Sequence, residues 1–328
     1  HGDYLSIKIL NKWSKKSKIF ITLHDLWLFT GHCGVPIDCD KFKFECGSCP
    51  DLKLPPMIIK DKTTENLNYK KKVINNIPIN YIAPSKWVYK QINSKYLHHN
   101  SKIKIINNSL DINLYKTTNK KKYRLELGLP LNKLILLTCS LGFKNNPYKD
   151  LETVLNALEE LNKNNICKNI LLVVIGEEKY NYKNYFTKHI KFISKVNQDT
   201  LIRKYYSSSD IYIHSSHIET WGLAISEALS FGLPIISSNV GGIPEQVRGY
   251  KYHAKDTINK YNIDLANGIL FPRGNISLLC KQIEFLYTNN SVAKKLGINA
   301  REYATNNLDI NQGILKHLNF YSETINTQ

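Results

Sequence analysis

Short apolar runs alternate along this chain with stretches whose apolar residues recur at helical spacing. Residues 85–96 follow a Pro-Ser start, and residues 151–161 place Leu and Val at helical intervals, so both are expected to be helices. Such alternation is typical of parallel sheets with helices on both faces, and it predicts an α/β protein. The expected strands are residues 19–23, 81–83, 103–106, 134–139, 170–176, 211–213, 234–237 and 269–271.

The chain is expected to form two domains. Its 328 residues are many for a single core. Residues 107–115 leave an expected strand through turn-forming residues, and the next strand begins only at Leu134. We therefore place a first domain at residues 1–110 and a second at residues 111–305.

The composition is that of a globular protein, with 42% hydrophobic residues and no apolar run of the roughly 18 residues that a membrane span needs. A cytoplasmic protein is expected. The formal charge is +18, and residues 1–110 carry 18 Lys against 8 Asp and Glu. Ordinary solvated faces or a peripheral contact with anionic lipid would both explain this charge. Nucleic acid is not an expected partner, because no zinc-finger spacing, RNP-like motif or basic zipper accompanies the lysines.

Glu219 and Glu227 lie eight residues apart across an expected strand-to-helix junction. Gly222 permits close backbone approach, and Thr220 can cap the helix. The amides at this helix start would bind phosphate. The two carboxylates would then hold sugar hydroxyls and a ribose, so the pattern predicts a sugar-nucleotide site. The phosphate-binding amides are those of Thr220, Trp221, Gly222 and Leu223.

These two carboxylates, followed by the segment 231–245 with its Gly241-Gly242 turn, resemble the C-terminal signature of the retaining glycosyltransferases of family 4. The resemblance implies a GT-B fold, in which two Rossmann-like domains face a cleft. It assigns the donor sugar to Glu219 and the ribose to Glu227. Gly241 and Gly242 would permit close approach of the backbone to the donor.

Two further residues resemble family positions. Lys149 looks like the lysine that grips the donor diphosphate, although Asp150 stands where the family usually has Gly. His24 looks like the strand-end histidine beside the donor sugar. Lys149 and the helix start near Gly222 would stabilise the leaving diphosphate, so no cofactor is expected to be required for catalysis.

The resemblance also implies that the first domain is incomplete, because the family's domain begins with a Gly-rich loop that has no counterpart here. By the same resemblance, a helix in residues 306–328 would return toward the first domain. Whether this shortened chain acts alone is left open.

Four cysteines, Cys33, Cys39, Cys46 and Cys49, lie within seventeen residues. A structural zinc site, reduced thiols and disulfides all remain open, since only Cys46 and Cys49 have a familiar zinc-knuckle spacing. The segment around them resembles an insertion in family 4 enzymes of capsular and exopolysaccharide (colanic-acid type) biosynthesis.

The sequence is therefore interpreted as a retaining glycosyltransferase that moves a sugar from a UDP- or GDP-sugar to a glycan acceptor, expected to be lipid-linked. A sugar-nucleotide epimerase of the same fold is an alternative, since a fold does not fix the chemistry. A noncatalytic, zinc-stabilised binding protein is a second alternative. Donor, acceptor, linkage and oligomeric state are not determined by the sequence.

Overall fold

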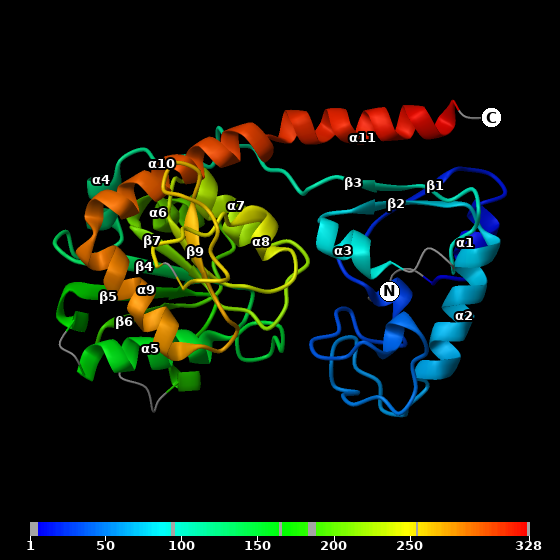
Figure 1. The fold of residues 1–328 in the computed structure, drawn as a ribbon, viewed down its shortest axis with the longest axis horizontal. Helices are drawn as coiled ribbons and strands as arrows, with labels where there is room; N and C mark the ends of the chain where they lie inside the picture. Colours follow the sequence, from blue (N-terminus) through cyan, green and yellow to red (C-terminus); the bar gives the residue numbers. More distant parts are fainter. Residues whose placement is uncertain (1–5, 93–95, 164–165, 183–187, 254, 327–328) are drawn as a thin grey trace. The chain divides into compact units, whose positions relative to one another are not determined.

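The structure is a computed structural model, and it describes residues 6–92, 96–163, 166–182, 188–253 and 255–326. The chain divides into two compact units, whose elements are labelled in Figure 1. Unit 1 comprises residues 1–108 and 313–328, and unit 2 comprises residues 109–312.

Unit 1 is built on a parallel sheet in the order β1-β2-β3. The central strand, β2, is buried along its whole length, as expected for a strand covered on both faces. The strands are β1 (Ile19–Thr22), β2 (Ile79–Ala83) and β3 (Ile103–Ile105). The helical segments are α1 (Ile9–Trp13), η1 (Trp27–Phe29), η2 (Lys41–Lys43), α2 (Thr63–Asn76) and α3 (Lys86–Gln91).

Helix α11 (Ile310–Ile325) contributes its residues from Gly313 onward to unit 1. Phe320 of this helix is buried with Ile82 and Ile106, and its ring meets that of Phe20 edge-on at 5.6 Å between centroids. The helix is therefore fixed to the sheet of unit 1 by a small aromatic and aliphatic cluster.

Unit 2 contains a six-stranded parallel sheet in the order β6-β5-β4-β7-β8-β9. Neighbouring strands are joined by parallel ladders, for example Leu134 opposite Ile170 and Tyr212 opposite Ile235. The strands are β4 (Leu134–Cys139), β5 (Ile170–Ile175), β6 (Ile190–Ile193), β7 (Ile211–His214), β8 (Ile235–Ser238) and β9 (Gly268–Phe271).

Alternate residues of these strands enter two different cores. Ile135 and Leu137 of β4 pack with residues of α6, α7 and α10, whereas Leu136 packs on the opposite face with residues of α5 and α9. Helices therefore cover both faces of the sheet, the arrangement of a Rossmann-like unit. The helical segments are α4 (Lys120–Glu126), α5 (Leu151–Lys163), η4 (Ile166–Asn169), η5 (Lys179–Tyr182), α6 (Asp199–Ser208), α7 (Leu223–Ser230), α8 (Ile243–Gln246), α9 (Ile276–Thr288) and α10 (Asn290–Asn307).

The predicted α/β class is confirmed, and each predicted strand overlaps an observed one. The predicted strands did not include β6, a half-buried edge strand whose apolar signal is interrupted by Lys191. The predicted helix 85–96 is wrong in its length. Ser85 caps α3 by accepting a hydrogen bond from the Val88 amide, but the helix ends at Gln91 and Ile92 is extended.

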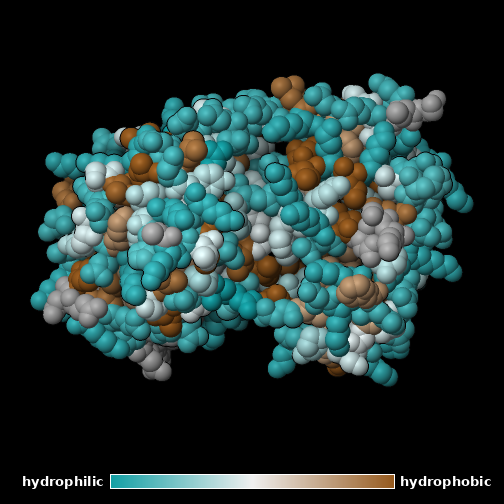
Figure 2. Space-filling view, viewed as in Figure 1, coloured by the Kyte–Doolittle hydropathy of each residue, from teal (hydrophilic) through white to brown (hydrophobic). Residues whose placement is uncertain are grey.

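The face of the molecule in Figure 2 is mostly hydrophilic, with hydrophobic residues in small groups. Within the described ranges, no helix is both long and apolar enough to cross a membrane.

Candidate functional site

The strand order of unit 2 reverses between β4 and β7, because β5 and β6 extend the sheet on one side and β8 and β9 on the other. At such a point the following loops leave a crevice at the carboxyl ends of the strands, where α/β proteins bind ligands. The loops after β4 and β7 are tied together here. The amide of Asp150 donates to the carbonyl of Ser215 at 3.1 Å, and that of His217 donates to the carbonyl of Tyr148 at 2.9 Å.

Lys149 and Glu219 form an ion pair between Nζ and Oε2 at this edge, with side chains 16% and 17% exposed. Burial by itself would raise the pKa of Glu219, but Lys149 and a hydrogen bond from His214 outweigh it and hold the pKa at about 2. Glu219 is therefore a carboxylate at neutral pH, and it is paired with the lysine that the resemblance assigns to the donor diphosphate.

His214, at the end of β7, contacts the carboxylate of this ion pair. Its Nε2 lies 3.3 Å from Oε2 of Glu219 and 3.0 Å from Oγ of Ser216. Burial, and then the nearby charge of Lys149, lower the pKa of His214. The imidazole is therefore neutral at physiological pH and acts as a hydrogen-bonding group.

Glu227 lies on α7 and accepts a hydrogen bond from the hydroxyl of Tyr206 at 2.8 Å. Burial is the main cause that raises the pKa of Glu227, with Asp199 adding to it and the bond from Tyr206 opposing it. The two predicted carboxylates thus differ in their electrostatic setting, because Glu219 has a cationic partner and Glu227 has a neutral donor.

Gly241 and Gly242 contact the backbone of Glu219. The amide of Gly242 donates to the carbonyl oxygen of Glu219 at 2.9 Å. Gly241 has φ +54°, and a Cβ there would lie 1.9 Å from that same oxygen. Only glycine fits this left-handed and crowded position. Their observed role is structural, because both glycines hold the backbone of Glu219 in place.

Helix α7 begins at Leu223, with Gly222 as its N-cap residue. The expectation that Thr220 caps this helix is therefore wrong, since Thr220 lies two residues before the cap. The side chain of Gln246 fixes the junction by accepting from the Gly222 amide at 2.9 Å and donating to its carbonyl at 3.1 Å. Trp221 is buried in the core and Leu223 is exposed.

Asp150, the departure from the family pattern, has a structural role. Its carboxylate accepts from the amide of Thr153 at 3.0 Å and from the Thr153 hydroxyl at 2.6 Å, in the manner of a helix N-cap. It also accepts from the hydroxyl of Ser215 at 3.2 Å. The acid therefore anchors α5 and joins the two loops that carry Lys149 and Glu219.

His24 is exposed and belongs to unit 1, just after β1, where its amide donates to the carbonyl of Thr22 at 3.2 Å. The other predicted donor-binding residues belong to unit 2. The role of His24 beside a donor sugar stays a prediction.

The four clustered cysteines line one cavity of about 20 Å³ in unit 1, together with His32. They are free of disulfides, and burial raises the pKa of the Cys33 thiol to about 12. Among the residues that the structure describes, no group of three or more His, Cys, Asp or Glu is arranged to hold a metal ion. The side chains as placed therefore do not form a zinc site. Zinc stays a prediction that metal analysis of the purified protein would test.

The sequence did not single out four polar side chains that lie under the two carboxylates. Tyr206 and Tyr212 are aromatic residues in otherwise apolar segments, Cys139 ends an apolar strand, and His214 ends another. The one available signal was the concentration of hydroxyl and imidazole groups in segments that are otherwise apolar.

Comparison with protein families identifies the chain. Residues 120–303, more than half of its length, match the model described as "Glycosyl transferases group 1". The chain belongs to this family. The matched region contains Lys149, Glu219, Glu227 and Gly241.

Curated relatives of this group 1 chain agree with the family. A glycogen synthase of Clostridium perfringens (strain 13 / Type A) is 28% identical over 226 residues, which are 64% of this chain and 42% of the relative. The putative colanic acid biosynthesis glycosyl transferase WcaC of Escherichia coli (strain K12) is 24% identical over 73% of this chain and 58% of the relative. The chain thus spans about half the length of these relatives.

Solved structures show the same fold. Anabaena Alr3699/HepE in complex with UDP matches 97% of this chain and 77% of its own, at a TM-score of 0.69 and 18% identity. A sucrose-phosphate synthase from Thermosynechococcus elongatus matches 83% of this chain and 65% of its own, at a TM-score of 0.64 and 18% identity. The GT-B class with two Rossmann-like units, which the sequence predicted, is confirmed.

Proposed function

We propose that this group 1 family member is a retaining glycosyltransferase. It transfers a sugar from a UDP- or GDP-sugar to a glycan acceptor, which is lipid-linked, during the synthesis of a surface polysaccharide. The observation that carries the proposal is the ion pair of Lys149 and Glu219 at the topological switch point of unit 2, with Glu227 on the adjacent helix. A donor nucleotide is supported by the HepE structure with UDP, and the polysaccharide by the name of WcaC.

In the proposed reaction, Glu219 binds hydroxyls of the donor sugar and Glu227 binds the ribose. Lys149 and the amides at the start of α7 bind the diphosphate, because a cation and a helix N-terminus both favour negative charge. The Gly222 amide is not among them, since it already donates to Gln246. The acceptor hydroxyl attacks the sugar from the face that the diphosphate leaves, the bond between the sugar and the diphosphate breaks, and the hydroxyl proton passes to the departing diphosphate. The same cation and amides stabilise the charge on the leaving diphosphate, so this proposal requires no divalent cation.

The protein is proposed to work at the cytoplasmic face of a membrane, where lipid-linked acceptors lie. The lysine excess of residues 1–110 would attract anionic headgroups, with each lysine near the surface contributing about 1 kcal/mol. Sedimentation with anionic vesicles that is lost at high salt tests this part of the proposal. Equal binding to neutral vesicles would contradict it.

Nucleotide binding is the first test of the function. UDP or GDP, but not both equally, should raise the melting temperature of the chain. Glu227→Gln should weaken binding of that nucleotide about 10-fold or more, because a hydrogen bond to a charged group is lost. Glu302→Gln removes an exposed carboxylate of α10 and is the matched control. If neither nucleotide binds, or if both variants bind like the parent, the proposed donor site is wrong.

A turnover assay distinguishes the proposed sugar transfer from the epimerase alternative. Incubation with the matching nucleotide sugar and a glycan acceptor should yield a product that retains the anomeric configuration of the donor. Epimerised donor, formed without acceptor, would instead identify an epimerase.

A further inference from the structure

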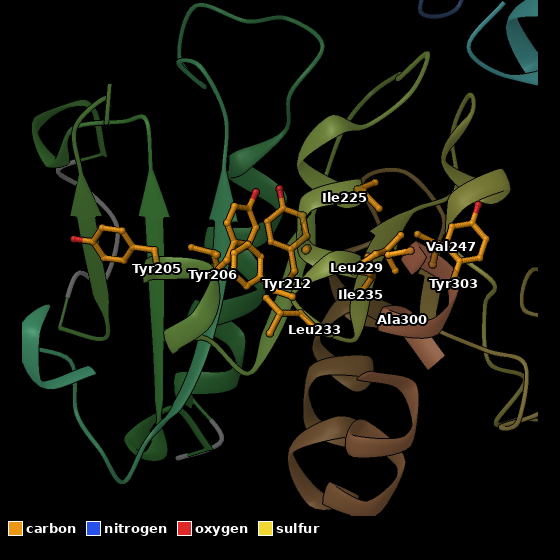
Figure 3. Close-up of a cluster of buried hydrophobic side chains, with 14 of the residues drawn as sticks. Tyr205, Tyr206, Tyr212, Ile225, Leu229, Leu233, Ile235, Val247, Ala300 and Tyr303 are labelled. Carbon is orange, nitrogen blue, oxygen red and sulfur yellow. The ribbon is translucent and has the colours of Figure 1, made fainter. Parts of the chain in front are cut away.

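Four polar side chains, three of them buried and one partly buried, form contacts that lead to the two site carboxylates. Tyr206 of α6 and Tyr212 of β7 stand next to each other in Figure 3, with both hydroxyls at the same end of their rings, whereas Tyr205 points away from them. The other two are Cys139, at the end of β4, and His214, at the end of β7.

The first part of this group leads to Glu227. The hydroxyl of Tyr206 donates to Oε2 of Glu227 at 2.8 Å, and Sγ of Cys139 lies 3.0 Å from the same hydroxyl. The carbonyl of Ala224 is a more distant acceptor for Tyr206 at 3.3 Å.

The second part leads from the same thiol to Glu219. Sγ of Cys139 lies 3.6 Å from the hydroxyl of Tyr212, which lies 3.4 Å from Nδ1 of His214. Nε2 of His214 then lies 3.3 Å from Oε2 of Glu219. One continuous series of polar contacts therefore joins the two carboxylates, with Cys139 at its centre.

The protonation states give this series a direction. Burial raises the pKa of both tyrosines well above 10.0 and that of Cys139 to about 11, so all three remain protonated at neutral pH. His214 is neutral because burial and Lys149 lower its pKa. Since the carboxylate of Glu219 can only accept, Nε2 of His214 carries the proton and Nδ1 accepts from Tyr212. Both tyrosine protons then point toward the carboxylates, that of Tyr212 by way of His214 and that of Tyr206 directly. The single proton of the Cys139 thiol serves only one tyrosine, the nearer Tyr206 at 3.0 Å, so the 3.6 Å approach of Sγ to Tyr212 is a polar contact without a proton of its own.

Packing alone does not require these polar atoms. The ring of Tyr206 stacks on Phe231 at 5.3 Å between centroids, a contact that phenylalanine would keep. Both tyrosine rings belong to an otherwise apolar core. Buried polar networks of this kind are retained where they hold their members in one geometry.

We infer that Tyr206, Cys139, Tyr212 and His214 are positioning residues that join Glu227 and Glu219 through one series of polar contacts, with a hydrogen-bonded arm to each carboxylate and Cys139 between the arms, so that the nucleotide and the donor sugar are recognised together. This inference rests on the proposed function, since it assigns the ribose to one carboxylate and the sugar to the other. Because coupling between two sites is reciprocal, a change at the Glu219 end should alter nucleotide binding at the Glu227 end.

The test uses UDP and GDP, which contain the ribose assigned to Glu227 but no donor sugar. The Kd of the one that stabilises the parent chain is measured. Tyr206→Phe should raise this Kd about 10-fold, because the donor to Glu227 is lost. Tyr212→Phe, which removes no group in contact with Glu227, should raise it about 5-fold. The double variant should resemble Tyr206→Phe, since the series is already broken. Tyr205→Phe is the matched control and should bind like the parent.

Two results would overturn the inference: parental nucleotide affinity in Tyr212→Phe, or effects of the two substitutions that multiply in the double variant. A measurement made without nucleotide tests the inference even if the proposed function is wrong. The ¹⁵N NMR spectrum of His214 should show a neutral ring protonated at Nε2 in the parent, and Tyr212→Phe should shift the Nδ1 resonance. A ring protonated at Nδ1, or a resonance unmoved by Tyr212→Phe, would contradict the series of hydrogen bonds even where nucleotide binding is absent.

Discussion

Two lysines, Lys70 buried in unit 1 and Lys149 partly buried in unit 2, have different partners. Lys70 of unit 1 is 4% exposed, and its Nζ donates to the carbonyls of Trp27 at 2.6 Å and Thr30 at 3.0 Å. The same Nζ lies 3.6 Å from the centroid of the Trp27 ring. Lys149 of unit 2 instead pairs with the carboxylate of Glu219.

The difference separates a structural lysine from one suited to bind a ligand. Burial lowers the pKa of Lys70 to about 7, because the carbonyl dipoles, the ring face and the nearby charge of Asp25 offset the lost hydration only in part. Lys149 keeps a formal counter-ion at the edge of a sheet, where an anionic ligand can compete for it. Burial of a lysine does not by itself indicate a binding site, and the proposed donor site rests on the pairing of Lys149 with Glu219 at the topological switch point.

Breaking the pair in unit 2 should have the largest effect. Lys149→Met leaves Glu219 without its cation and should lower the free energy of unfolding by about 3 kcal/mol. The proposed transfer should fall at least about 100-fold, because the leaving diphosphate loses its cationic partner. Chemical denaturation and turnover assays measure the two effects.

Two further variants test whether this cost comes from the unpaired charge. The double variant Lys149→Met/Glu219→Leu should recover most of the stability but none of the transfer. Lys204→Met, which breaks the exposed pair with Glu126, should change neither property appreciably. Recovery of transfer in the double variant would refute the proposed role of Lys149.

The Gly241→Ala variant perturbs the same pair through the backbone. Its Cβ would collide with the carbonyl of Glu219 at a φ of +54°, so the variant should lose about 3 kcal/mol of stability and most nucleotide-sugar binding. Gly274→Ala is the matched control, because Gly274 has φ +71° and open space around its missing Cβ. It should lose only about 1 kcal/mol. Equal losses in the two variants would show that the contact with Glu219 does not matter.

Replacing Lys70 of unit 1 should lower stability but leave nucleotide binding unchanged. Lys70→Met loses both hydrogen bonds to buried carbonyls, which should lower the free energy of unfolding by about 2 kcal/mol. Nucleotide binding should remain within about 2-fold of the parent, since no phosphate role is assigned to Lys70. Lys71→Met is the neighbouring control, because Lys71 also contacts a carbonyl and a ring but is less buried. If Lys70→Met lost nucleotide affinity while Lys71→Met did not, Lys70 would also have a role in binding, and the proposed difference between Lys70 and Lys149 would be wrong.

The smallest expected effect is the pH dependence that Lys70 introduces. Its pKa is about 7 in the folded chain against an ordinary 10.5, so the unfolded chain binds more protons between these values and stability rises with pH. The rise should be about 1 kcal/mol between pH 7 and pH 8. Above roughly pH 10 the sign should reverse, because burial raises the pKa of Cys33 from 9.0 and the unfolded thiol ionises first. Denaturation curves of the parent should show the rise, and curves of Lys70→Met should lack it.

Much of the fold follows from local pattern. Strand β4 and helix α5 lie where apolar runs and helical spacing predicted them, and α11 (Ile310–Ile325) lies within the residues 306–328 where the resemblance implied a helix. The period of the apolar residues identifies β4 and α5 even though their packing partners are distant in sequence. Strand β6 was not predicted, because an edge strand needs few apolar residues. The end of α3 was predicted too late, because a helix end depends on its surroundings.

The sequence by itself determined that the chain is a glycosyltransferase of the GT-B class, and it named Glu219, Glu227 and Lys149 as charged candidates, because these residues belong to local motifs. Only the tertiary structure decided how they are held. Cys139 contacts Tyr206 across 67 positions, and Lys149 contacts Glu219 across 70. Such partners are brought together by the order of strands in the sheet, and no local pattern of polar and apolar residues encodes that proximity.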